Sequence, residues 1–194
     1  MLYLKLSRNQ GREWSSVTVS SLAKKIIGVN DIVVENVDLE TTAKGEQLVI
    51  RARPRRSSQK RCSVCGRECP GFDQGKGVRR WRVPELGNGI KVFIEAEAPR
   101  VCCPEHGVVV QQVPWARHRS GFTRNFEDIA VWLSLHLSRK ACAEYLRVSW
   151  DSVGPMITRV EKELSGGHNR YDGLVRIAID ETSYKKGHKY LTLI

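Results

Sequence analysis

The sequence lacks any hydrophobic run long enough to cross a membrane. The longest apolar-rich stretch without a charged residue, Ile129 to Ser138, is half of the ~20 residues that a membrane-spanning helix needs. The first residues, Met1 to Lys5, contain no continuous apolar segment of the kind found in signal peptides. We therefore expect a protein with no membrane partner, located in the cytoplasm.

Acidic residues are scarce relative to basic ones. The 194 residues include 32 Lys and Arg against 21 Asp and Glu, a formal net charge of +11. Residues 51–82 carry eleven of the basic and two of the acidic side chains, so most of the excess lies in this one segment. Nine of the eleven are Arg, whose planar guanidinium suits phosphate.

Aromatic, glycine and cysteine residues lie among these cations, which favours a nucleic-acid partner over a merely solvated basic loop. The cations expected to contact phosphates of this partner are Arg51, Arg53, Arg55, Arg56, Lys60, Arg61, Arg79, Arg80 and Arg82.

Two short motifs have the spacing of metal ligands. The first is Cys62-Ser-Val-Cys65-Gly, and the second is Cys103-Pro-Glu-His106-Gly. A tight turn lets the two ligands of each motif reach one ion, and the glycine accommodates the backbone as its amides approach sulfur. In a cytoplasmic protein, cysteines bind metal more often than they form disulfides. The spacing predicts a structural zinc ion held by Cys62, Cys65, Cys103 and His106.

Two further cysteines compete for the same places. Cys69 follows Cys65 by four residues, and Cys102 precedes His106 by four, so either could replace one of the four expected ligands. Free buried thiols with a surface histidine are the other alternative. A catalytic zinc is disfavoured, because four protein ligands close the site.

The segment between the two motifs has the pattern of strands. Ile90, Val92, Ile94 and Ala96 alternate within residues 90–98, as in a half-buried strand, and residues 81–83 are also extended in character. Antiparallel strands here would bring the distant motifs together. We expect a small zinc-ribbon-like β module whose folding depends on the metal.

The periodicity changes to that of helices after Pro114. Apolar residues recur at helical spacing in residues 123–137, in a short segment from Ser138 that includes Cys142 as a core residue, and in a third segment that ends before Gly166 and Gly167. Three helices with the last two closely joined predict a helix-turn-helix, although a plain helical hairpin has the same periodicity.

The third of these helices would enter the major groove of DNA by its first residues. These are Trp150, Asp151 and Ser152, with Arg159 placed further along toward phosphates. Pro155 is tolerated only in the first turn of a helix, so we expect the helix to begin near Ser152 or to be kinked there.

Residues 173–181 read as a buried strand that ends in Asp180 and Glu181, followed by a polar turn at residues 182–189 and a second strand from Tyr190. An acid at the end of such a strand is a place where RNase H-like phosphoryl-transfer enzymes hold Mg²⁺. No Asp or Glu follows Glu181.

The order of these features resembles the bacterial DDE insertion-sequence transposases of the ISL-three group. The resemblance runs from about residue 27 to residue 194. The motifs that carry it are Arg51–Arg56, the two metal motifs, Val113-Pro-Trp-Ala-Arg117, Phe122-Thr-Arg124 and Ile177-Ala-Ile-Asp180-Glu181. The family pattern is a zinc finger and a helix-turn-helix that bind the terminal inverted repeats of the element. An RNase H-like domain then uses an Asp, Asp, Glu triad with Mg²⁺.

The resemblance implies an α+β chain in four parts. Residues 1–26 are an unassigned lead-in, 27–115 a basic zinc-finger module, 116–168 the helix-turn-helix, and 169–194 the first strands of an incomplete RNase H-like domain. Asp180 corresponds to the first catalytic acid, and the second Asp and the Glu have no counterpart.

The resemblance therefore implies the N-terminal fragment of a transposase that binds double-stranded DNA and is associated with the nucleoid. We expect this fragment to be inactive alone, with Mg²⁺ used only by a full-length parent. A zinc-stabilised transcriptional regulator is the alternative. The target sequence and the oligomeric state, a homo-oligomer included, stay open.

Overall fold

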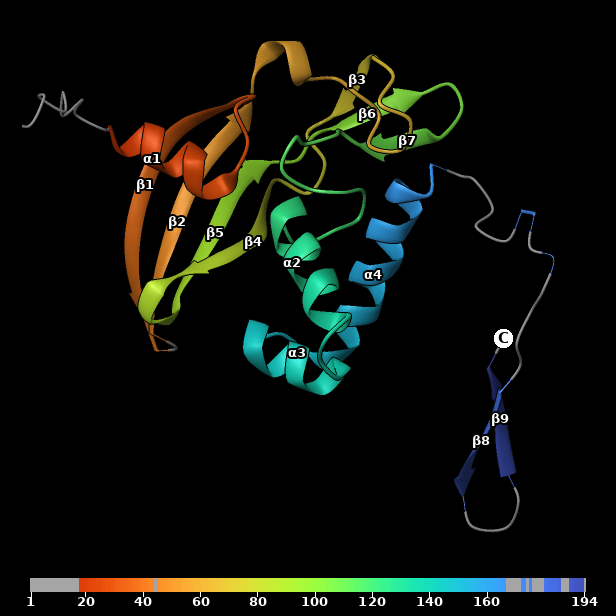
Figure 1. Ribbon diagram of the computed structural model, residues 1–194. Helices are drawn as coiled ribbons and strands as arrows, with labels where there is room; N and C mark the ends of the chain where they lie inside the picture. The colour runs from red at the N-terminus through yellow and green to blue at the C-terminus, as the bar shows by residue number, and fades with distance from the viewer. Residues whose placement is uncertain are drawn as a thin grey trace, which may run out of the picture. The chain divides into compact units, whose positions relative to one another are not determined.

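The computed structural model describes residues 18–43, 45–166, 172, 173, 175, 180–185 and 189–193. The chain divides into two compact units, one ending at Ile157 and the other beginning at Thr158 (Figure 1). The described residues form helices together with antiparallel and mixed sheets, so the predicted α+β class is confirmed. None of the helices among them has the length and apolarity that crossing a membrane requires.

Helix α1, Val19–Ile27, lies mostly within the residues that the sequence left unassigned. Thr18 caps its first turn by accepting a hydrogen bond from the backbone N–H of Ser21, and Gly28 ends it with a φ of 76°. The helix buries Ala23 and Ile27 in the largest apolar core of the chain. It is therefore an integral part of the first unit.

A four-stranded sheet carries this core. Its strands are β1 Ile32–Thr42, β2 Gly45–Pro54, β4 Val78–Leu86 and β5 Ile90–Glu97, in the order β1-β2-β5-β4. β2 and β5 are parallel and the other pairs antiparallel. The predicted strand from residue 90 is confirmed, with Val92, Ile94 and Ala96 buried on one face. The core beneath it includes Trp81 and Trp115, whose rings meet edge to face with centroids 5.5 Å apart.

A second, three-stranded sheet has the order β3-β6-β7 and consists of β3 Gly71–Asp73, β6 Arg100–Cys103 and β7 Gly107–Val110. Its buried cluster is small, comprising three cysteines and Val101, with Val109 packed against them. We call this sheet, together with the Cys62–Gly66 turn, the metal module.

The three helices predicted after Pro114 are present as α2 Arg124–Ser134, α3 Arg139–Leu146 and α4 Trp150–Leu164. Thr123 and Ser138 cap α2 and α3 by accepting backbone hydrogen bonds from Phe126 and Ala141. Cys142 is fully buried, as predicted. We call α2, α3 and the part of α4 up to Ile157 the helical segment.

The third helix was expected to begin near Ser152 or to be kinked there, and it begins two residues before Ser152. α4 begins at Trp150, so Pro155 lies in its second turn and not in the first. Ser152 donates its backbone N–H to the carbonyl of Ser149, which starts the helix ahead of the proline. The helix persists because Val153 and Met156, on either side of Pro155, are fully buried in the core of the helical segment.

In the second unit, the extent of the predicted hairpin also differs from expectation. β8 is Asp180–Lys185 and pairs antiparallel with β9, Lys189–Leu193. The residues from Thr182 to Lys185, expected in the turn, are therefore part of a strand, and Asp180 is paired with Leu193. Residues 176–179 of the predicted first strand lie outside the described residues.

Candidate metal centre and nucleic-acid interface

The two metal motifs converge from separate parts of the metal module. The ligand atoms of Cys62, Cys65, Cys103 and His106 all lie within 4.8 Å of one another. Cys62 and Cys65 come from the turn before β3, Cys103 ends β6, and His106 lies in the turn into β7. This is the quartet that the sequence favours.

The separations between these atoms suit a tetrahedral ion. The Sγ atoms of Cys65 and Cys103 are 3.8 Å apart, and Nδ1 of His106 lies 3.8 Å from Sγ of Cys62 and 3.5 Å from Sγ of Cys103. Ligands ~2.3 Å from a central ion lie about 3.8 Å from each other in a tetrahedron. The structure also identifies Nδ1 as the histidine atom that faces the thiols, a detail that spacing could not give.

Glycine supports both turns by adopting a left-handed backbone. Gly66 has a φ of 72° and Gly107 a φ of 65°, values that side-chain-bearing residues rarely adopt. The first turn is closed by hydrogen bonds from the N–H of Gly66 to the carbonyl of Cys62 and from the N–H of Cys62 to the carbonyl of Arg67.

Electrostatics favour an ionised thiol at one position of the cluster. The hydrogen bond with His106 lowers the pKa of Cys103 to about 6, against the opposing effect of burial. A thiolate is the form of cysteine that binds metal. Cys103 is therefore prepared to act as a metal ligand at neutral pH.

The competing cysteines have different surroundings. Burial raises the pKa of Cys69, and its thiol donates a hydrogen bond to the carbonyl of Arg67 at 3.4 Å. Cys102 is exposed, because neighbouring side chains on β6 point to opposite faces. Neither belongs to the four-atom cluster.

Four of the nine cations expected to contact phosphates are committed to carboxylates. Arg51 pairs with Asp38 at 2.5 Å, Arg53 with Glu35 at 2.9 Å and Arg80 with Glu95 at 2.6 Å. These three pairs join neighbouring strands of the four-stranded sheet. The fourth cation, Arg82, pairs with Glu85 on its own strand.

Arg82 is 8% exposed, pairs with Glu85 and lies under the start of the helical segment. Its backbone N–H donates to Gly121 and its carbonyl accepts from Thr123, so β4 is joined to the residues that lead into α2. Its position indicates a structural role at this joint.

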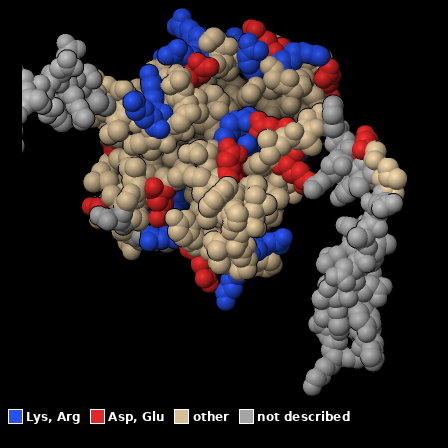
Figure 2. Space-filling view, viewed as in Figure 1, with Lys and Arg blue, Asp and Glu red and all other residues tan. Residues whose placement is uncertain are grey.

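The other five expected cations make no ion pair with a carboxylate in the described part of the chain. They are Arg55, Arg56, Lys60, Arg61 and Arg79. Arg61 instead donates to the carbonyl oxygens of Ser57 and Gly66, and Arg79 lies over the ring of Trp81. In Figure 2, Lys and Arg side chains gather along the upper edge, over the region where Figure 1 places β3, β6 and β7, with acidic side chains between them.

The residues expected to read bases lie at the start of α4. Trp150 is 62% exposed and Asp151 is exposed, whereas Ser152 and Arg159 are partly buried. The three residues Arg147, Val148 and Ser149 join α3 to α4, and Arg147 takes a left-handed conformation with a φ of 52°. Asp180 lies in β8, and its side chain is outside what the structure describes.

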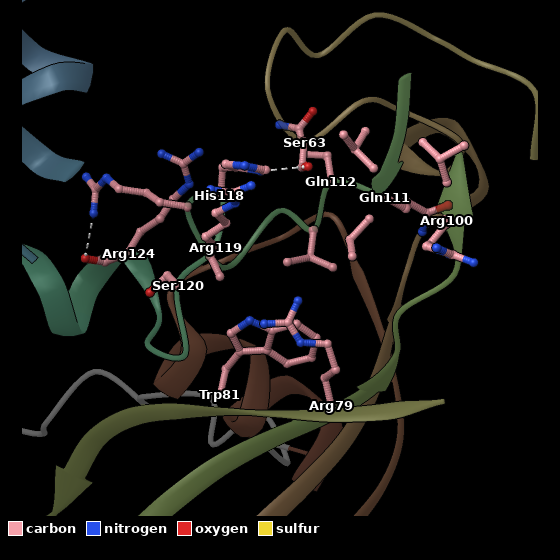
Figure 3. A pocket seen from close by; sticks show the side chains of 16 residues that line it. Ser63, Arg79, Trp81, Arg100, Gln111, Gln112, His118, Arg119, Ser120 and Arg124 are labelled. Atoms are coloured by element: carbon pink, nitrogen blue, oxygen red, sulfur yellow. Dashed lines mark hydrogen bonds between the residues drawn. The ribbon is translucent and has the colours of Figure 1, made fainter. Parts of the chain in front are cut away.

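Sequence reasoning missed the cations around the start of α2. Arg117 and Arg119 precede the helix and Arg124 is its first residue, and all three line one pocket with Arg79 and Arg100 (Figure 3). The available signal was the run Arg117-His118-Arg119, which lies outside the strongly basic segment and within a region whose charges balance.

Comparisons with known proteins relate this geometry to a family. Residues 111–160, which include α2, α3 and most of α4, match the model described as the helix-turn-helix domain of transposase family ISL3. These residues are therefore similar to the helix-turn-helix domain of that family. It is 41% identical over 176 residues, or 89% of its length, to proteins named transposase for insertion sequence element IS1557 from two strains of Mycobacterium tuberculosis, CDC 1551 / Oshkosh and ATCC 25618 / H37Rv.

The chain spans 39% of the length of these relatives. No solved structure matches it. The resemblance inferred from the motifs agrees with both comparisons.

Proposed function

We propose that this chain binds double-stranded DNA as the DNA-recognition part of an insertion-sequence transposase, and that its targets are the terminal inverted repeats of the element. The match of residues 111–160 to the helix-turn-helix domain of family ISL3 carries the proposal. The cations that have no carboxylate partner among the described residues, beside the metal module and at the start of η1 (Arg56–Ser58), support it. Self-association of the chain is left open.

The metal cluster supports the fold in this proposal. Three thiolates and one imidazole match the preference of zinc, and together they fill the four positions of a structural site. When bound, zinc would supply folding free energy to a sheet whose own apolar cluster is small. With Cys62 held as a ligand, the preceding residues Lys60 and Arg61 would be kept in fixed positions.

In this proposal, two surfaces make different kinds of contact with the DNA. Arg55, Arg56, Lys60, Arg61 and Arg79 would contact phosphates, which gives affinity without reading sequence. The start of α4, with Trp150, Asp151 and Ser152, would read base edges in the major groove. Arg159 lies further along the same helix and would contact a phosphate.

The salt dependence of binding tests the first surface. If about six phosphates are contacted, log K should fall with log salt with a slope of roughly −5, measured by fluorescence anisotropy on a labelled duplex. Replacing Arg55 and Arg56 by Ala should weaken binding about equally on every sequence and make the slope less steep. An unchanged slope in that double variant would remove these two cations from the interface.

Selection from a pool of randomised duplexes tests the second surface. We expect the zinc-loaded wild-type chain to enrich one motif, and Trp150→Ala with Ser152→Ala to enrich a degenerate one at little cost in overall affinity. The Arg55→Ala, Arg56→Ala variant is the matched control, because it should keep the motif while binding more weakly. If that control also loses the motif, the division between the two surfaces is wrong.

Asp180 is proposed as the first acid of a DDE triad, from the resemblance alone. The chain carries only this one of the three acids, so we expect it to perform no strand cleavage or transfer by itself. Incubating the pure 194-residue chain with Mg²⁺ and duplex DNA, followed by gel analysis, checks this. Strand cleavage that is lost in Asp180→Asn would overturn it.

A further inference from the structure

A basic pocket lies at the joint between the metal module and the residues that lead into α2. Its volume is about 240 Å³, and its walls come from β4, β6, β7 and residues 111–124. Five arginines line it, and none of its lining residues is Asp or Glu. They are Arg79, Arg100, Arg117, Arg119 and Arg124. A pocket of this size and charge suits a small anionic group better than a large cofactor.

Arg100 and Arg117 already pair with carboxylates. Arg100 donates to Asp73, with Nε 2.8 Å from Oδ1, and this contact lowers the pKa of the Asp73 carboxyl. Arg117 pairs with Asp128 at 2.8 Å and with the buried Glu127 at 3.3 Å. Their charges are largely balanced by these partners, so they shape the pocket more than they attract an anion.

Arg79 is held in place without a carboxylate among the described residues. Its guanidinium carbon lies 5.1 Å from the centre of the Trp81 ring, and Figure 3 shows the two side chains together at the base of the pocket. Trp81 is 2% exposed and fixed against Trp115. Stacking on a buried ring restricts the arginine while leaving its N–H donors free for an oxygen ligand.

Arg119 makes no ion pair within the described parts of the chain, and its backbone is unusual. It has a φ of 58°, in a turn closed by a hydrogen bond from the N–H of Ser120 to the carbonyl of Arg117. This conformation costs an L-residue roughly 1 kcal/mol, and glycine or asparagine would adopt it more readily. The turn is held by Ser120, which is 1% exposed and donates its hydroxyl to Glu127 at 2.7 Å.

The pocket also connects the first metal turn to this segment. His118 Nδ1 and Ser63 Oγ are 2.8 Å apart, and Ser63 lies between the two expected ligands Cys62 and Cys65 (Figure 3). The backbone N–H of Gln112 donates to the carbonyl of Arg61. An anion bound here would therefore touch both the metal module and the segment that positions the helices.

We propose that this pocket binds one phosphate group of the DNA backbone, with Arg79 and Arg119 as its ligands. The proposal rests on the proposed function, since it requires that the chain binds duplex DNA. One phosphate fixed at this joint would set the register of the metal module and of α4 along the same duplex. A backbone phosphate and free inorganic phosphate could bind the same arginines, so the test distinguishes between these two ligands.

The test compares variants of the zinc-loaded full chain on a labelled 30-base-pair duplex at several salt concentrations. The double variant Arg79→Ala, Arg119→Ala should lose about tenfold or more in affinity and should flatten the salt slope by about 1, the value for one phosphate. Arg119→Lys keeps the charge and should keep the slope. Arg100→Ala is the control for loss of one charge, because it removes a single positive charge from the same pocket, and from an arginine already paired with Asp73.

A second measurement uses the wild-type chain and so does not depend on how the variants fold. Phenylglyoxal modifies accessible arginines, and mass spectrometry locates the modified sites. The duplex should protect Arg79 and Arg119, and inorganic phosphate at the same ionic strength should protect them far less. Protection by inorganic phosphate but not by the duplex would mean a site for a free anion and would overturn the proposal.

The outcomes separate this proposal from the one on which it rests. If the wild-type chain binds no duplex, the proposed function fails. If it binds and the double variant binds with the same affinity and slope, the phosphate pocket fails while DNA binding stands. Loss of affinity in the control Arg100→Ala as large as in the double variant would also overturn the assignment of Arg79 and Arg119.

Discussion

The metal module and the helical segment are stabilised in opposite ways. In the metal module, the buried cluster is Cys62, Cys69, Val101 and Cys103, so two of its four residues are expected metal ligands. In the helical segment, the buried cluster is built on Phe126, Ala130 and Met156 with neighbours that are almost all apolar. A sheet of three short strands buries too little apolar surface to fold alone, whereas packed helices supply their own core.

The two regions also differ in how they use charge. The segment that enters the metal module leaves Lys60 and Arg61 without a carboxylate among the described residues, as expected of a surface that meets phosphate. The helical segment instead buries the carboxylate of Glu127 completely and neutralises it with Arg117. Charge in one region is available to a partner, and charge in the other fixes the turn that precedes α2.

The largest expected effect comes from removing a metal ligand, which should destabilise the metal module and leave the helical segment folded. Cys103→Ser should abolish stoichiometric zinc binding and destabilise the metal module by roughly 5 kcal/mol or more, because zinc supplies much of the folding free energy of such modules. The helical signal in circular dichroism should persist. Zinc content and thermal unfolding measure the two effects.

Cys102→Ser is the control for this variant, since Cys102 is the adjacent residue on β6 and is exposed. It should keep zinc and stability. Equal loss of zinc in both variants would show that Cys102 takes part in the site.

Acidification should act on the same region. Because the folded-state pKa of Cys103 is lowered to about 6, its thiolate contributes stability that is complete above the ordinary thiol pKa and is lost as the pH falls through about 6. Protonation of the ligands competes with zinc, so the affinity for zinc should weaken as the pH is lowered. Transfer of zinc to a colorimetric chelator across this range measures the release. Full retention of zinc at pH 5 in the presence of the chelator would contradict the assignment.

Truncating the apolar core should affect only the helical segment. Phe126 is 1% exposed and its ring stacks on that of Phe122 at 5.0 Å, so Phe126→Ala should lower the free energy of unfolding by about 3–5 kcal/mol. Urea unfolding followed by circular dichroism measures this loss, and zinc content should not change.

Trp132→Ala provides the matched control in the same helix, because Trp132 is 61% exposed and its removal should cost less than about 0.5 kcal/mol. If Phe126→Ala also releases zinc, the two regions do not fold independently and the contrast between them is weaker than their cores suggest.

The smallest expected effect concerns the link between the helical segment and the β4–β5 hairpin. Arg147 contacts Gly89 O at 3.4 Å and Glu85 at 3.6 Å while holding a φ of 52°. Arg147→Gly and Arg147→Ala both remove these contacts, but only glycine adopts that backbone without strain, so the glycine variant should be more stable by about 1 kcal/mol. Urea midpoints compare them. Equal stability would show that residue 147 is not left-handed in solution.

Much of this arrangement follows from local sequence. Two ligands separated by two residues and followed by glycine predict a metal turn wherever they occur, and the structure brings the two turns together. Apolar residues at spacings of two and of about 3.6 predicted β5 and the three helices for the same reason, since each period reflects the geometry of a single element. Pro155 misled the prediction because burial of Val153 and Met156 outweighs the local penalty of proline.

The sequence by itself therefore predicted β5, the three helices after Pro114 and the location of the excess charge, and it favoured the metal-ligand quartet that the structure brings together. Only the tertiary structure decided which cations are available, because Arg51, Arg53 and Arg80 find their carboxylates 13, 18 and 15 residues away along the chain. It also decided that Arg79 and Arg119, 40 residues apart, share one pocket. Pairing across strands and packing between segments depend on distances in space, which the order of residues does not contain.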